Sequence, residues 1–158
     1  MKKFLFLFLA LPLFSDHPKL LMMGAGVFDV DRKHPLFQYQ LEYRSDYEIF
    51  LSDPLFIRPL VGFMGTTKGA LYLYTGIAFD VFLGKSLVFT PSFAPGLYYD
   101  GGGKSLGFPL EYRSTVELAY RTETEARIGF QFYHISNGSV GRKNPGTESL
   151  VFFLAFPL

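Results

Sequence analysis

The chain has 158 residues, which is enough for one domain of ordinary size and gives no reason to expect two. It contains no cysteine, so disulfides and thiolate zinc sites are excluded, and a formal net charge of +1 gives no indication of nucleic-acid binding. Hydrophobic residues make up 49% of the sequence, with 19 Phe and 10 Tyr, but only one long unbroken apolar run occurs. Apolar surface elsewhere must therefore come from alternating residues.

That apolar run lies at the N-terminus. Lys2 and Lys3 precede it, and it extends from Phe4 to Phe14, which is too short to span a bilayer as a helix. We expect residues 1–15 to be a secretory signal peptide and residues 16–158 to form a single domain. Cleavage after Ser15 suits the small residue there, although the sequence leaves the exact position open.

Two stretches, Leu36–Leu51 and Phe108–Arg121, alternate between apolar residues on one parity and polar or charged residues on the other. This period of two predicts strands. Alternation alone also fits a soluble barrel or sandwich. However, these stretches exceed the typical strand of about 5 to 6 residues in globular proteins, whereas a tilted membrane strand needs about 9 to 11. We therefore expect a transmembrane barrel.

Six further strands complete the predicted fold: Leu20–Val30, Phe56–Met64, Leu71–Leu83, Leu87–Tyr99, Glu125–Ser136 and Thr147–Leu158. The predicted fold class is all-β, an eight-stranded antiparallel transmembrane β-barrel of the outer-membrane type. Side chains fill the interior of so small a barrel, so we expect no channel. The charged residues of inward parity are expected to form a buried ionic network: Glu42, Arg44, Asp46, Glu48, Glu111, Arg113, Glu117, Arg121 and Arg127.

The connections alternate between short turns and mostly longer links. Outer-membrane barrels have short periplasmic turns and longer external loops, so we assign the longer links to the extracellular end. These links are Asp31–Pro35, Gly65–Gly69, Asp100–Gly107 and Asn137–Gly146. They carry most of the basic loop residues: Arg32, Lys33, Lys68, Lys104, Arg142 and Lys143. Such residues could meet lipid phosphates, but we expect simple solvation to be the commoner case.

The predicted strand boundaries do not decide whether four tyrosines lie in aromatic girdles at the membrane interfaces or in the barrel interior. They are Tyr72, Tyr74, Tyr98 and Tyr99.

Three polar residues fall on the apolar face of the last two predicted strands. His134 and Ser136 share the parity of the membrane-facing residues of Glu125–Ser136, and Glu148 has the membrane-facing parity of the final strand. Residues two apart on a strand lie about 6.5 to 7 Å apart, so His134 could act as general base for Ser136. Antiparallel pairing could bring Glu148 to the other imidazole nitrogen. The alternative is that polar residues are merely tolerated near the membrane interface.

The run His134–Gly138 (HISNG), followed by Asn144–Gly146 (NPG) and Glu148, resembles the signature of the outer-membrane lipid A 3-O-deacylase (PagL) family. The resemblance is specific over Phe130–Phe153 and only architectural elsewhere. It implies an eight-stranded barrel in the bacterial outer membrane that hydrolyses the ester-linked 3-hydroxyacyl chain at position 3 of lipid A. Lipid A lies in the outer leaflet with this ester near the head groups, which would explain catalytic residues that face the bilayer.

The resemblance also implies roles for individual residues. The family's catalytic serine, histidine and glutamate match Ser136, His134 and Glu148, and its two asparagines match Asn137 and Asn144. We expect the oxyanion donors to come from the segment Asn137, Gly138 and Ser139 and from the side chain of Asn144. For the asparagines the alternative is loop turn chemistry, and Gly138, Gly141 and Gly146 are expected to shape the loop.

We expect no cofactor and no metal, because His17 and His34 are far from the motif in sequence. The expected partners are the membrane and lipid A or lipopolysaccharide, with a homodimer conceivable. Three other functions stay open: a structural or adhesive barrel without activity, a phospholipase acting on glycerophospholipids, and a secreted soluble barrel. The sequence leaves open the preferred acyl length and the regulation in an intact membrane.

Overall fold

The computed structural model describes residues 17–31, 35–47, 49–52 and 55–158. The expected signal peptide lies outside these residues, as do Arg32, Lys33, His34 and Glu48. No helix in the described part of the chain is long and apolar enough to cross a membrane.

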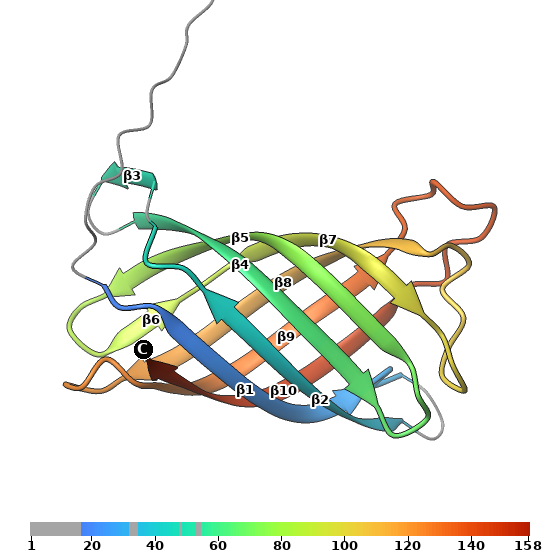
Figure 1. Cartoon of the computed structure of the whole chain (residues 1–158), viewed down its shortest axis with the longest axis horizontal. Coiled ribbons are helices and arrows are strands. Elements are labelled where there is room, and N and C mark those ends of the chain that lie inside the picture. Colours follow the sequence, from blue (N-terminus) through green and yellow to red (C-terminus); the bar gives the residue numbers. More distant parts are fainter. Residues whose placement is uncertain (1–16, 32–34, 48, 53–54) are drawn as a thin grey trace, which may run out of the picture.

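The described residues form ten strands in one closed antiparallel sheet (Figure 1). The strands are β1 Leu20–Phe28, β2 Leu36–Arg44, β3 Ile49–Ser52, β4 Leu55–Thr66, β5 Leu71–Leu83, β6 Leu87–Phe89, β7 Ser92–Tyr99, β8 Leu110–Arg121, β9 Arg127–Ser136 and β10 Thr147–Pro157. Pairing of β1 with both β2 and β10 closes the barrel. β6 and β7 both lie between β5 and β8 and form one wall, whereas β3 pairs only with β4. The predicted eight-stranded barrel is confirmed.

Both ends of the described chain lie at one end of the barrel, where the Leu158 N–H donates to the Lys19 carbonyl at 2.9 Å. We call this the turn end, because the short turns after β5 and β8 lie there (Figure 1). The opposite end carries the longer links after β1, β7 and β9 together with the short link after β4, and we call it the loop end.

Two predicted strands are interrupted in the structure, and the others differ from the prediction by no more than two residues at either end. The stretch predicted as Leu36–Leu51 ends at Arg44, because the Ser45 hydroxyl accepts a hydrogen bond from the Tyr47 N–H at 3.0 Å and stabilises a turn. The stretch predicted as Leu87–Tyr99 is interrupted at Pro91, which has no N–H to donate. The wall nevertheless continues through this break, because the Pro91 carbonyl still accepts from the Phe79 N–H at 2.9 Å.

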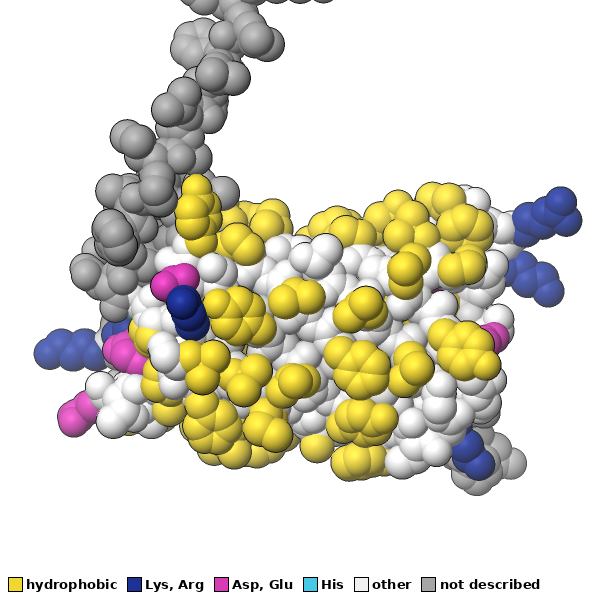
Figure 2. Space-filling model, in the orientation of Figure 1, with side chains coloured by type: hydrophobic (Ala, Val, Ile, Leu, Met, Phe, Trp, Pro, Cys, Tyr) yellow, Lys and Arg dark blue, Asp and Glu magenta, His cyan; other side chains and the backbone are white. Residues whose placement is uncertain are grey.

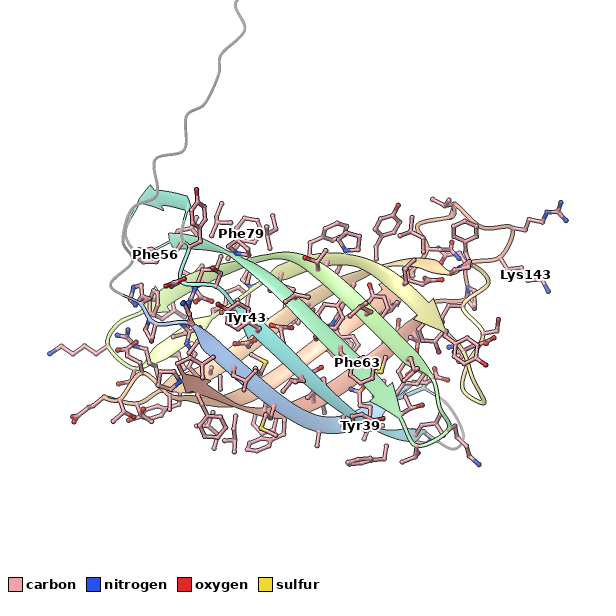
Figure 3. All side chains as sticks on the ribbon, in the orientation of Figure 1. Tyr39, Tyr43, Phe56, Phe63, Phe79 and Lys143 are labelled. Carbon is pink, nitrogen blue, oxygen red and sulfur yellow. The ribbon has the colours of Figure 1, made fainter. Side chains whose placement is uncertain are left out.

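The face of the barrel in Figure 2 is apolar over its middle and carries charged side chains at both ends. Outward aromatic side chains include Tyr39 and Phe63 toward the loop end and Tyr43 and Phe79 toward the turn end (Figure 3). Phe56 has the inward parity of β4 and packs against Phe82 at the turn end. The four tyrosines left undecided by the sequence divide between both places: Tyr72, Tyr74 and Tyr98 are buried in the barrel, and Tyr99 is exposed outside it.

The barrel interior holds a network of buried ion pairs. Arg44 donates to Glu42 at 2.8 Å and to Glu117 at 2.6 Å, and Arg113 contacts Glu42 at 3.1 Å. Arg127 is also buried, so five predicted members of the network are confirmed. Glu111 is buried as well, but no ion pair joins it to another described residue.

The sequence interpretation missed Asp80 at the centre of the turn-end half of this network. Its carboxylate lies 2.8 Å from Arg127, 3.5 Å from Arg58 and 3.8 Å from Arg44. Arg58 was missed as well, and its guanidinium also donates to the carbonyls of Ser45 and Pro18.

Two predicted network members lie outside it. Asp46 follows the end of β2 and pairs with Lys19 at 3.8 Å, with both side chains about half exposed. Arg121 lies at the turn end and pairs with Glu125 at 3.1 Å. Asp46 lies outside the network because it follows the end of β2, where the parity of the strand no longer applies. Arg121 keeps the inward parity, but it is the last residue of β8 and lies at the end of the barrel.

We expect Asp80→Ala to lower the free energy of unfolding by about 3 to 5 kcal/mol, because it leaves buried arginine charges without their partner. Asp46→Ala is the matched control, since an exposed pair contributes only about 0 to 1 kcal/mol. Urea unfolding of the refolded barrel, followed by circular dichroism, measures both. Equal unfolding midpoints for the two variants would contradict a stabilising role of the network.

Candidate active site

The three outward polar residues of β9 and β10 meet at the loop end. In the register of these strands Glu148 pairs directly with His134. His134 Nδ1 lies 2.7 Å from Glu148 Oε1, and the side chains are 44% and 31% exposed. Both side chains have the outward parity, alternating with inward residues that are fully buried. The predicted contact between His134 and Glu148 is confirmed as geometry.

Ser136 is the last residue of β9 and is half-buried on the same outward face. Its neighbour across the sheet is Tyr112 of β8. No hydrogen bond joins Ser136 to His134 among the described residues, although residues two apart on one face lie about 6.5 to 7 Å apart. Because Nδ1 is engaged by Glu148, Nε2 is the imidazole nitrogen left for Ser136. In enzymes without substrate such hydrogen bonds are often long and shorten when substrate binds.

Gly146 packs against the imidazole ring of His134. Its φ is 60°, in the left-handed region, and a Cβ placed on it would lie 2.8 Å from His134 Cε1 and 3.3 Å from Nε2. A side chain at this position would therefore push against the imidazole and would also strain the backbone. The sequence indicated only a loop-shaping role for this glycine, whereas the structure gives it a direct contact with the histidine.

Asn137 organises the loop between β9 and β10. Its Nδ2 donates to the carbonyls of Leu106 at 2.9 Å and Lys143 at 2.8 Å, and its Oδ1 accepts from the Ser139 N–H at 3.0 Å. The Asn137 N–H itself donates to Asn144 Oδ1 at 3.0 Å. The Lys143 side chain points away from the barrel (Figure 3), so only its carbonyl takes part.

These bonds restrict which groups could bind an oxyanion. The side chain of Asn137 is fully buried with both functions occupied, and the N–H groups of Asn137 and Ser139 are already donating. Two of the predicted donors have no partner among the described residues: the Gly138 N–H and Asn144 Nδ2. The φ of 60° at Gly138 is one that glycine adopts without strain.

The arrangement provides a hydroxyl nucleophile, an imidazole base and a carboxylate that orients the imidazole, which is the set needed for acyl transfer. The described residues contain no group of three or more His, Cys, Asp or Glu side chains placed to hold a metal ion. The whole set lies on the apolar outer surface, so its chemistry is accessible from the bilayer side.

Comparisons with known proteins bear on the family and the fold of the chain. The family model described as Lipid A 3-O-deacylase (PagL) matches residues 32–157. The crystal structure of the outer membrane enzyme PagL is similar with a TM-score of 0.72 and 17% sequence identity, covering 88% of this chain and 99% of that one. A de novo designed transmembrane β-barrel is similar with a TM-score of 0.61 and 9% identity, covering 94% and 100%. At such identities both likenesses concern the fold. No curated protein sequence matches the chain.

We expect Gly146→Ala to lower turnover of a chromogenic ester by about 10²-fold, because a displaced imidazole loses its alignment with the nucleophile. Gly84→Ala is the matched control: Gly84 also has a positive φ, 75°, but a Cβ there has nothing within 4 Å. Both variants should lose about 1 to 2 kcal/mol of stability from backbone strain. Equal turnover in the two variants would contradict the importance of the glycine contact.

Proposed function

Because the chain belongs to the lipid A 3-O-deacylase (PagL) family, we propose that Ser136, His134 and Glu148 hydrolyse the ester-linked 3-hydroxyacyl chain at position 3 of lipid A. Membership makes the protein an ester hydrolase of the outer membrane. The observation that carries the proposed site is the 2.7 Å contact between His134 and Glu148 on the lipid-facing surface beside Ser136.

The position of this contact supports a membrane-embedded substrate. A charged side chain on the lipid face of a barrel costs up to about 2 to 4 kcal/mol at the midplane and less near the interface. Glu148 is on that face, and its one cationic partner among the described residues is the imidazole of His134 in its protonated form. We infer that the loop end is extracellular, which places the three residues near the head groups of the outer leaflet, where lipid A reaches them laterally.

In the proposed reaction the Ser136 hydroxyl attacks the ester carbonyl while His134 Nε2 takes its proton. Glu148 stabilises the resulting imidazolium through Nδ1. When the tetrahedral intermediate collapses, His134 returns the proton to the departing sugar oxygen, leaving the acyl group on Ser136. A water molecule, deprotonated by His134, then attacks the acyl group, and the free 3-hydroxy fatty acid and the Ser136 hydroxyl are released.

The oxyanion of each intermediate needs donors that are in place before the reaction. We propose the Gly138 N–H as the principal donor, with Asn144 Nδ2 as a second, because neither has a partner among the described residues. Asn137 has an indirect role, because its hydrogen bonds hold the backbone of the segment that carries Gly138. The homodimer considered from the sequence stays a prediction.

Mass spectrometry of lipid A mixed with refolded protein in detergent tests the function. We expect wild type to remove one ester-linked 3-hydroxyacyl group, Ser136→Ala to leave the lipid unchanged, and Glu148→Gln to be slower by roughly 10⁴-fold. Glycerophospholipid in a parallel reaction tests the phospholipase alternative. Cleavage of that lipid alone would contradict the proposed substrate, and an equally active Ser136→Ala variant would contradict the nucleophile.

Asn137→Asp tests the loop. The change keeps the size of the side chain but removes both donors to the carbonyls of Leu106 and Lys143. We expect kcat to fall by about 10²-fold, because the oxyanion donors lose their alignment. Arg142→Gln, which alters an exposed residue of the same loop, is the control and should keep its kcat. Retained kcat in Asn137→Asp would show that the oxyanion is bound by groups that this loop does not position.

A further inference from the structure

We propose that the ion pair between Asp29 and Lys104 positions the active site by holding two of its parts at once: the start of β10, which carries Glu148, and the link that supports Asn137. This inference rests on the proposed function, because it assigns the pair to the same reaction. Neither residue contacts the three catalytic side chains, so each acts through its neighbours.

The first connection runs from Asp29 to Glu148. Asp29 follows β1, is 3% exposed and has a φ of 59°. Its Oδ1 accepts hydrogen bonds from Lys104 Nζ at 2.8 Å and from Thr147 Oγ1 at 3.2 Å. Thr147 is fully buried and directly precedes Glu148, whose carbonyl accepts from the Val30 N–H at 3.0 Å. Asp29 and Val30 together therefore fix the strand that carries Glu148.

The second connection runs from Lys104 to Asn137. Lys104 lies in the link after β7, and its carbonyl accepts from the Tyr98 hydroxyl at 2.8 Å. Two residues later, Leu106 is buried and its carbonyl accepts from Asn137 Nδ2 at 2.9 Å. The two links also touch, since a Cβ on Gly107 would lie 2.5 Å from the Lys143 carbonyl. Both lie at the loop end (Figure 1). The ion pair therefore joins this link to β1 and β10.

The pair is suited to this role by its partial burial. The Asp29 and Lys104 side chains are 5% and 30% exposed, so the contact is shielded from the solvent that weakens surface pairs. Hydrogen bonds between two charged groups are roughly twice as strong as those between neutral groups. Removing either charge would leave the other partly buried without its partner, and the link would be free to shift.

Lys104 could instead serve by contacting an anionic head group of the substrate, and the experiment separates the two roles. The refolded full-length barrel is assayed on lipid A and on an uncharged chromogenic ester. We expect Lys104→Met and Asp29→Asn each to lower kcat by about 10- to 100-fold on both substrates, with KM changed by less than about threefold. Asn accepts the positive φ of position 29 and can keep the hydrogen bond to Thr147.

Two further variants make the test specific. The double variant should be no slower than the slower single variant, because both changes break the same pair. Lys104→Arg should recover most of the activity. Lys68→Met removes an exposed lysine at the same end of the barrel and should leave turnover of the uncharged ester unchanged. Heat-modifiable gel mobility shows whether each variant is folded. If Lys104→Met does not fold, the kcat values of Asp29→Asn and Lys104→Arg test the role of the ion pair.

A loss confined to lipid A and to Lys104→Met, with Asp29→Asn unaffected, would overturn the proposal in favour of a head-group contact. Additive losses in the double variant, or unchanged kcat in both single variants, would also overturn it. If wild type cleaves the uncharged ester but leaves lipid A intact, the proposed substrate fails, while the ester assay still decides the role of the ion pair.

Discussion

The structure depends on one constraint: inside a bilayer every backbone N–H and C=O must find a partner within the protein. A closed sheet meets this demand, and the pairing of β1 with β10 closes it. Closure then gives each strand one face toward lipid and one toward a packed interior. Alternate residues of a strand therefore meet different surroundings: by this rule polar side chains face the interior and apolar side chains face the lipid. His134, Ser136 and Glu148 depart from that rule together and at one place.

The barrel interior holds polar side chains, as this rule requires, and several of them are charged groups that lose their hydration. The interior accommodates these charges because some of its carboxylates and guanidinium groups contact more than one group of opposite charge. Asp80 serves three arginines, and Arg44 and Arg113 both contact Glu42. The side chains of this network fill the barrel, so its interior has a structural role. The proposed site lies on the outer wall, where β9 and β10 hold His134 and Glu148 in a fixed register. A site carried by paired strands is more rigid than one carried by loops alone.

Sequence alone could predict the part of the fold that parity controls. Alternation located the barrel and the outward position of His134 and Glu148, because a residue's side of the sheet is a local property. It failed where a turn ended a strand early, as at Ser45, and so wrongly placed Asp46 inside. Contacts between distant segments were equally inaccessible. In the sequence Lys104 is a lysine in a polar loop, which predicts a solvated side chain. Only the folded chain brings it to Asp29, which is 75 residues away in sequence.

The asparagines show a further limit of sequence. An asparagine can donate to an oxyanion or to a carbonyl of its own loop, and its position in a motif does not separate these roles. In the structure, burial decides between the two roles for Asn137. Both Nδ2 hydrogens donate to carbonyls, and the side chain is buried away from the surface. Its place in the motif then reflects the shape of the loop more than direct contact with substrate. The proposed active site accordingly has two kinds of support: strand register fixes His134 and Glu148, and side-chain hydrogen bonds fix the backbone that we propose as the oxyanion donor.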